Sequence, residues 1–143
     1  MMTRKLNPRW MMVAGVLAAL ALAWRFFGPV YVSIASEQGD LPFTVQALPP
    51  GVWAMPGQMM HVQYRIRNND LSPLEARADI QVLPTGAKGQ MEVFLSQCAG
   101  LNTFQNSVTS DYDVFFRVQP AGLLGSSVLT LEHVFTRANT RMP

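Results

Sequence analysis

Cys98 is the only cysteine of the 143-residue chain, and it stands in the segment VFLSQCAGLNTF, residues 93 to 104. Thiolate sulfur is a preferred ligand of Cu(I), but tight binding needs at least two sulfur or imidazole ligands. A single cysteine forms no disulfide within its own chain. Cys98 is therefore a candidate ligand of a soft metal ion that requires a second group, either from elsewhere in the chain or from Cys98 of a second copy in a homodimer.

Methionines and histidines are the remaining candidates for a second ligand, and nothing in their spacing places any of them beside Cys98. Methionine fills gaps in apolar cores far more often than it binds copper, and a lone cysteine is itself commonly a small, partly buried apolar residue in a loop. His61 alternates with apolar residues, which predicts a solvated side chain. His133 is in phase with apolar residues, which predicts a half-buried, hydrogen-bonded side chain. The candidates are Met59, Met60, Met91, His61 and His133.

Residue patterns that support catalysis are missing from the sequence. Asp111 and Asp113 lie two positions apart, on one face of an expected strand, where paired carboxylates are usually a solvated edge rather than an acid and a base. The serines have no nucleophile-elbow context, and the glycines form no phosphate-binding loop. We therefore expect a chain that is not an enzyme.

The charge is divided unevenly along the chain. Residues 1 to 35 contain Arg4, Lys5, Arg9 and Arg25 and no acidic residue. Residues 36 to 143 contain seven Lys/Arg against nine Asp/Glu, so their net charge is close to −2. No basic stripe that would neutralise phosphates is present there, and nucleic-acid binding is not expected.

The N-terminal segment is apolar enough to cross a membrane. Residues 10 to 24 contain no charged side chain, and after Arg25 the apolar run continues to Ala35. Because about 20 helical residues span the roughly 30 Å of hydrocarbon in a bilayer, we expect a transmembrane anchor over residues 10–35. Arg25 is then expected near the outer interface, where its long side chain reaches the lipid headgroups.

The basic residues before the anchor predict its orientation. Cytoplasmic flanks of membrane helices are enriched in lysine and arginine, so residues 1–9 are expected in the cytoplasm and residues 36–143 in the periplasm of a bacterial inner membrane. The alternative is a cleaved signal peptide, with Ser33 and Ala35 as a small-residue cleavage site. That site lies eleven residues beyond the uncharged run, which favours the uncleaved anchor.

Residues 36–143 have the alternation of β-strands. Apolar side chains recur at every second position, and turn sequences such as NND and LPTG separate the runs. We expect about seven short strands, in an all-β, immunoglobulin-like antiparallel β-sandwich preceded by one N-terminal transmembrane helix. The clearest strands are HVQYRIR (61–67), RADIQV (77–82), DYDVFFRVQP (111–120) and LTLEHVF (129–135).

The order of these segments resembles a known family, the membrane-anchored copper-delivery factors of cytochrome c oxidase, called the CtaG family in bacteria. The resemblance covers nearly the whole chain and implies one transmembrane helix followed by an immunoglobulin-like domain on the outer side. It rests on LPFTVQ (41–46), MPGQ followed by HVQYRIRNND, ADIQVLP (78–84), VFLSQCAGLNTF, DYDVFFRVQP and LTLEHVFT.

The chain departs from the family at the residues that hold copper. The family's metal segment is typically Cys-Phe-Cys-Phe, whereas here Cys98 is followed by Ala99 and Gly100. The family also has a cysteine just after its anchor, where this chain has Gly28. On an extended strand the two cysteines of Cys-x-Cys share one face, so the replacement at position 100 removes half of the clamp.

The resemblance leaves two functions open, and the fold alone leaves a third. The chain is expected to deliver Cu(I) through Cys98 to a haem–copper oxidase, or to serve as an accessory structural subunit of such an oxidase or of a copper monooxygenase in the membrane. The loss of two thiols favours the accessory role. Since fold does not fix function, the third is a membrane-tethered binding module with no copper role.

Overall fold

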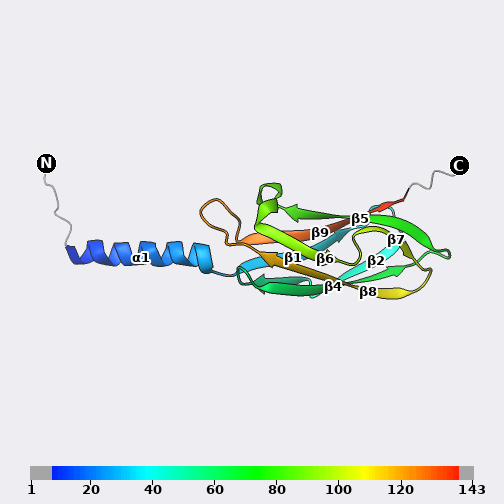
Figure 1. Cartoon of the computed structure of the whole chain (residues 1–143), viewed down its shortest axis with the longest axis horizontal. Coiled ribbons are helices and arrows are strands. Elements are labelled where there is room, and N and C mark those ends of the chain that lie inside the picture. Colours follow the sequence, from blue (N-terminus) through cyan, green and yellow to red (C-terminus); the bar gives the residue numbers. More distant parts are fainter. Residues whose placement is uncertain (1–7, 139–143) are drawn as a thin grey trace.

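The computed structural model describes residues 8–138, in which one long helix leads into a β-sandwich (Figure 1). Of the expected cytoplasmic segment 1–9, only Pro8 and Arg9 are among the described residues, and both belong to the helix. The elements are α1 (Pro8–Phe27), β1 (Val30–Glu37), β2 (Phe43–Leu48), β3 (Gly51–Ala54), β4 (Met59–Asn68), β5 (Leu74–Leu83), the 3-10 helix η1 (Thr85–Gln90), β6 (Met91–Ser96), β7 (Gly100–Phe104), β8 (Thr109–Val118) and β9 (Val128–Arg137).

Helix α1 is long and apolar enough to cross a membrane, with a mean hydropathy of 1.8 over its most apolar 18 residues. It begins at Pro8, a residue that suits the first helical turn because its missing N–H has no partner there. It ends where Gly28 donates its N–H to the carbonyl of Trp24 at 2.7 Å, and Pro29 cannot continue the helix. A Cβ at Gly28 would collide with that carbonyl, so the tight end requires glycine. None of the α1 side chains is buried against the sandwich.

The expected anchor over residues 10–35 is wrong at its C-terminal boundary. The helix ends at Phe27, and the apolar run beyond it is strand β1. Val30, Val32 and Ile34 alternate with Tyr31 and Ser33, and they point into the core with 1%, 0% and 6% of their surface exposed. One apolar run therefore serves two environments, first a helix exposed on all sides and then a strand with one buried face.

Two sheets face each other and form the sandwich. One has the strand order β3-β1-β9-β5-β7, and the other has the order β2-β4-β8-β6. The strands within each sheet pair antiparallel, except that β1 runs parallel to β9. The all-β sandwich behind one N-terminal helix is thus confirmed. The described residues contain nine strands rather than about seven, because the expected anchor takes in β1 and β3 has only four residues.

The period-two pattern predicts the buried faces correctly. In β4, the side chains of Val62, Tyr64 and Ile66 are each no more than 1% exposed. The inward side chains of β8 and β9 behave in the same way, from Val114 to Phe135. Burial of such side chains contributes roughly 25 cal/mol per Å² of apolar surface, so these faces dominate the stability of the sandwich.

The strand directions sort the connections into two groups (Figure 1). The start of β1 lies beside α1, and Ala54 at the end of β3 pairs with Val30 there. The near end of the sandwich, next to α1, therefore consists of residues 55–58, 84–90 and 119–127. The far end consists of residues 38–42, 69–73 and 105–108, and there Phe43 packs its ring 4.8 Å from that of Phe104.

Candidate functional site

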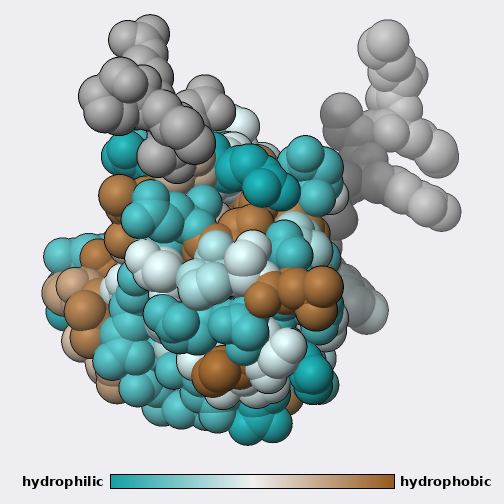
Figure 2. Space-filling view, turned by 90° about the vertical axis from the view of Figure 1, so that its right-hand side faces the viewer, coloured by the Kyte–Doolittle hydropathy of each residue, from teal (hydrophilic) through white to brown (hydrophobic). Residues whose placement is uncertain are grey.

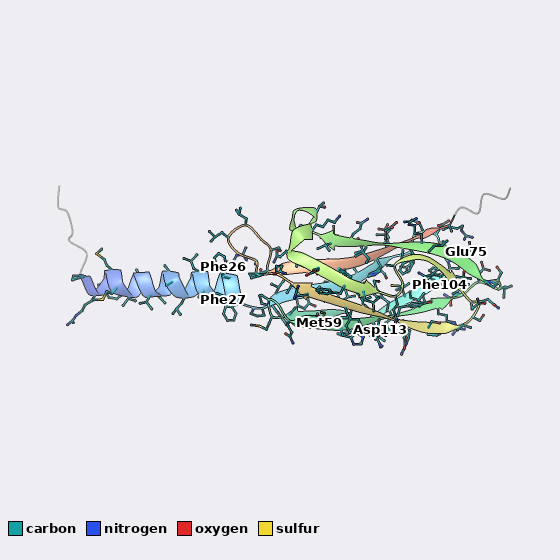
Figure 3. All side chains as sticks on the ribbon, viewed as in Figure 1. Phe26, Phe27, Met59, Glu75, Phe104 and Asp113 are labelled. Carbon is teal, nitrogen blue, oxygen red and sulfur yellow. The ribbon has the colours of Figure 1, made fainter. Side chains whose placement is uncertain are left out.

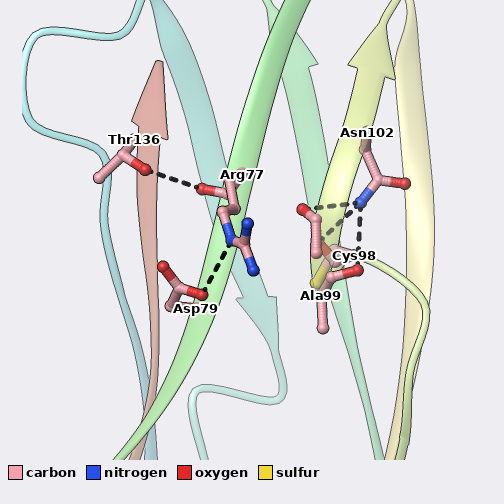
Figure 4. A network of polar contacts seen from close by, with 7 residues as sticks. Arg77, Asp79, Cys98, Ala99, Asn102 and Thr136 are labelled. Carbon is pink, nitrogen blue, oxygen red and sulfur yellow. Dashed lines mark hydrogen bonds and ion pairs between the residues drawn. The ribbon is translucent and has the colours of Figure 1, made fainter. Parts of the chain in front are cut away.

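Cys98 lies in a tight turn between β6 and β7, and none of its surface is exposed. The side-chain amide of Asn102 holds the turn closed, since its Nδ2 donates to the carbonyl oxygens of Cys98 at 2.9 Å, Ala99 at 3.4 Å and Gly100 at 3.5 Å (Figure 4). The structure thus places the cysteine in a loop, as the sequence predicts, but deeper than the partly buried position expected for it.

Ser96 connects Cys98 to His133. Its Oγ lies 3.6 Å from Cys98 Sγ and 2.8 Å from His133 Nε2. The His133 ring is fully enclosed and lies 4.5 Å from the ring of Tyr64, whose hydroxyl donates to the carbonyl of Ala35 at 2.7 Å. We call Tyr64, Ser96, Cys98 and His133 the buried polar cluster. His133 is hydrogen-bonded as expected, but it is fully rather than half buried.

Burial keeps the titratable groups of the buried polar cluster uncharged. It raises the pKa of the Cys98 thiol, an effect that the hydrogen bond from Ser96 only partly offsets. It lowers the pKa of His133 to about 4, and it raises the pKa of Tyr64 far above its usual range. Because a thiol must lose its proton to bind a metal or attack an electrophile, the folded chain holds Cys98 in its less reactive form.

Gly100 shows why the turn does not resemble a Cys-x-Cys strand. Its φ is +81°, in the left-handed region that side chains other than glycine rarely adopt. A Cβ at this position would meet no atom within 4 Å, so the backbone and not crowding selects glycine. Cys98 and position 100 are therefore not two neighbouring positions on one face of an extended strand.

Among the expected second ligands that the structure describes, His133 is linked to Cys98. The link is indirect, because Ser96 Oγ lies between the thiol and the imidazole. Met91 begins β6, whereas Cys98 lies beyond its end. Met59 is 51% exposed, and Met60 follows it at the start of β4. No group of three or more histidine, cysteine, aspartate or glutamate side chains in residues 8–138 is placed to hold a metal ion. Whether Cys98 binds Cu(I) stays a prediction.

Polar pairs cover the outer face of β4 and β8. Asp113 accepts hydrogen bonds from His61 Nε2 at 2.7 Å and from Gln63 Nε2 at 2.9 Å (Figure 3 labels Asp113). Asp111 accepts two bonds from the guanidinium of Arg65, at 2.8 and 2.9 Å. These bonds hold the pKa of both carboxyls below its usual range.

Asp111, Asp113 and His61 lie on the solvent-facing side of the sheet, as the alternation of the sequence predicts. Both carboxylates are engaged in pairs that favour their charged form, which is an arrangement of a stabilised sheet surface. His61 is 47% exposed at its side chain, as the prediction of a solvated residue requires. Its ring also stacks on Phe115, with the ring centres 4.5 Å apart, which the sequence did not indicate.

A cleft of about 680 Å³ opens at the near end, between η1 and the loop of residues 119–127. Arg25, in the last turn of α1, reaches into it and donates from Nη2 to the carbonyl of Gly125 at 2.6 Å. Gln90 fixes the other side of the loop, since its Nε2 donates to the Ser126 carbonyl at 2.6 Å and its Oε1 accepts from the Ser126 N–H at 3.0 Å. Sequence reasoning placed Arg25 near a membrane interface but gave no signal for Gln90 or the cleft.

The chain matches no model of a known protein family and has no significant match among curated proteins. The resemblance to copper-delivery factors therefore stays a prediction from the sequence. The β-sandwich behind an apolar helix is the part of that prediction that the structure bears out.

Proposed function

We propose that this chain is a membrane-anchored accessory protein of the bacterial inner membrane. Its β-sandwich lies on the periplasmic side and associates with a copper-dependent membrane enzyme, either a haem–copper oxidase or a copper monooxygenase. The enclosure of Cys98 carries the choice of an accessory role over copper delivery. A carrier must expose its ligands to donor and acceptor, whereas this thiol is sealed by its own turn and kept protonated.

The start of β1 supports an anchor that stays attached to the sandwich. Cleavage after Ala35 would remove most of β1, including the core residues Val30, Val32 and Ile34. It would also remove the Ala35 carbonyl that accepts from the Tyr64 hydroxyl, and it would leave β9 without its parallel partner. A processed chain would thus lose a central strand, so the folded sandwich is better explained by an intact N-terminus.

Sharing of copper between two chains is disfavoured by the same geometry. Two Cys98 side chains could meet across a homodimer only if the turn of residues 97–99 opened in both copies. That opening would break the Asn102 bonds to the turn and the contact of Cys98 with Ser96.

The orientation with a periplasmic sandwich is supported by the basic residues that precede α1.

Affinity purification of the full chain from native membranes in mild detergent tests this proposal. We expect subunits of a copper-dependent membrane enzyme in the mass spectrum, at the same yield for the wild type and for Cys98→Ala. A matched variant with α1 replaced by an unrelated membrane-spanning helix shows whether the sandwich or the helix makes the contact.

Two outcomes would replace the proposal with one of its alternatives. Stoichiometric Cu(I) on the purified chain, lost in Cys98→Ala, would establish copper delivery. Recovery with a complex that contains no copper enzyme would establish a tethered binding module. Metal analysis of the same samples therefore separates the three functions in one preparation.

A further inference from the structure

Two exposed leucines stand at the tip of the loop that borders α1. Leu124 is 102% exposed and Leu123 is 68% exposed, so the rest of the chain leaves Leu124 uncovered and most of Leu123 exposed. The loop of residues 119–127 contains no charged residue. Exposure of two adjacent apolar side chains to water is unfavourable, and such exposed apolar patches commonly mark a surface that contacts a membrane or another protein.

The loop is fixed in place, so the exposure of its tip is a property of the fold. Gly125 donates its N–H to the Ala121 carbonyl at 2.7 Å and closes the turn that presents the two leucines. A Cβ at Gly125 would collide with that carbonyl. The base is held by Gln90, which is only 8% exposed and bonds to Ser126.

The loop is also joined to the last turn of α1. The Arg25 guanidinium donates to the Gly125 carbonyl at 2.6 Å. Gly122 lies so close to Phe26 that a Cβ there would be 3.6 Å from the phenylalanine ring. Phe26 and Phe27, 40% and 73% exposed, mark the end of α1 that adjoins the sandwich (Figure 3). The leucines therefore stand at the level where the helix ends.

A second apolar rim lies at the same end of the sandwich. Met55, 48% exposed, borders a groove that it shares with Leu20, Trp24 and Phe27 of α1. Trp53 on β3 is 67% exposed, and residues 51–58 contain no charge. The far end differs, since its surface is mostly hydrophilic, with apolar residues in separate patches (Figure 2).

We propose that the near end of the sandwich rests on the bilayer that α1 crosses, with Leu123 and Leu124 buried in its interfacial layer. This inference rests on the proposed membrane anchor and adds a second contact with the same lipid. The apolar side chains of α1 extend through Phe27 to the level of the leucines. The one charged group between them, the Arg25 guanidinium bonded to Gly125, would then lie at the depth of the headgroup phosphates. Tryptophan at such a boundary prefers the interface, which suits Trp53 and Trp24.

Site-specific fluorescence of the full chain in vesicles of phosphatidylethanolamine and phosphatidylglycerol tests the proposal. Three single-cysteine chains are made in a Cys98→Ala background and labelled with a polarity-sensitive dye: Leu124→Cys at the loop tip, Leu71→Cys at the far end and Leu17→Cys in α1. Leu71 is a matched control because it is a leucine of a loop and is 92% exposed.

We expect aqueous iodide to quench the dye at position 124 about fivefold less than the dye at position 71. Spin labels shallow in the lipid should quench position 124 more than labels placed deep in the acyl chains. If position 17 is reached by deep lipid labels while position 124 is quenched by iodide as fully as position 71, the anchor stands and the interfacial contact is wrong.

Two further results would also overturn the contact. If deep lipid labels fail to reach position 17, the membrane anchor itself fails, and this inference fails with it. Shielding of position 124 from both iodide and the lipid labels would show that a second protein copy, and not the bilayer, covers the leucines.

Discussion

Two regions of the molecule treat their notable residues in opposite ways. At the near end, Leu124 projects with no protein around it, beside a helix that has no buried side chain. In the interior, Cys98 and His133 are fully enclosed, although a thiol and an imidazole are the groups that sequence reasoning selects for chemistry. The thiol and the imidazole, which could take part in a reaction, are buried, whereas the leucine, a typical core residue, is exposed.

This difference supports the proposal that the near end is where the chain meets the membrane. An enclosed polar group contributes to a unique packing arrangement through the hydrogen bonds that it makes, as His133 does through Nε2 although its buried Nδ1 has no partner. A bare apolar group contributes only when something covers it. The interior cluster is therefore read as part of the fold, and the near end as the surface of contact. Substitutions of the same kind in both regions separate the two roles.

The largest expected contrast comes from placing aspartate in each region. Cys98→Asp should lower the free energy of unfolding by about 4 kcal/mol at pH 7, because burial opposes the charged carboxylate by about three pKa units. Leu124→Asp should change it by less than about 0.5 kcal/mol in detergent micelles, because the side chain has no protein neighbours to lose. Urea titrations followed by circular dichroism measure both. Equal losses for the two variants would contradict the contrast.

The next effect is a pH dependence that originates in the interior. The folded-state pKa of His133 is lowered to about 4, from an unfolded value near 6.5. Between these values the unfolded chain binds the additional proton, so the stabilisation is complete above pH 6.5 and is lost as the pH falls toward 4. The loss should amount to about 3 kcal/mol.

A histidine substitution assigns this pH dependence to its source. Unfolding titrations of His133→Gln between pH 4 and pH 6.5 should show a much flatter slope than those of the wild type. The matched variant His61→Gln alters an exposed histidine and should retain most of the wild-type slope. An unchanged slope in His133→Gln would mean that other groups carry the dependence.

The smallest effect concerns the glycine beside the interior thiol. Gly100→Cys should cost about 1 kcal/mol of stability, because a Cβ in the left-handed region is unfavourable by about that amount. Gly89→Cys, in η1, meets no atom within 4 Å and has no positive φ, so it provides the control for added bulk. A Gly100→Cys chain as stable as the Gly89→Cys chain would indicate that the turn re-forms as a strand, and Cu(I) titration would then show whether a clamp had been created.

Sequence periodicity predicted the sandwich well and its first strand poorly. In residues 61–67 and 129–135 the alternation of apolar and polar side chains predicts both the strand and its buried face. Over residues 30–35 the composition is apolar enough to extend the anchor. The alternation of Val30, Val32 and Ile34 with Tyr31 and Ser33 was the signal that marked a strand instead.

Contacts between distant segments were beyond the reach of the sequence. Ser96 on β6 meets His133 on β9 across the two sheets, and the pattern along a strand states only that each side chain points inward. The bond from Arg25 to Gly125 joins residues 100 positions apart. Such partners depend on how the sheets and the helix pack, which neither spacing nor composition specifies.

Only Gly28 and Pro29 separate α1 from β1, and the Gly28 N–H is bonded back to the helix. A connection this short leaves the sandwich little freedom to rotate relative to α1. With α1 as the proposed anchor, the strands then keep a set direction with respect to the membrane normal. The ten residues of β9 rise about 30 Å at roughly 3.3 Å each. In the proposed arrangement, a partner that contacts the far end of the sandwich must therefore present its binding surface at about that height above the lipid.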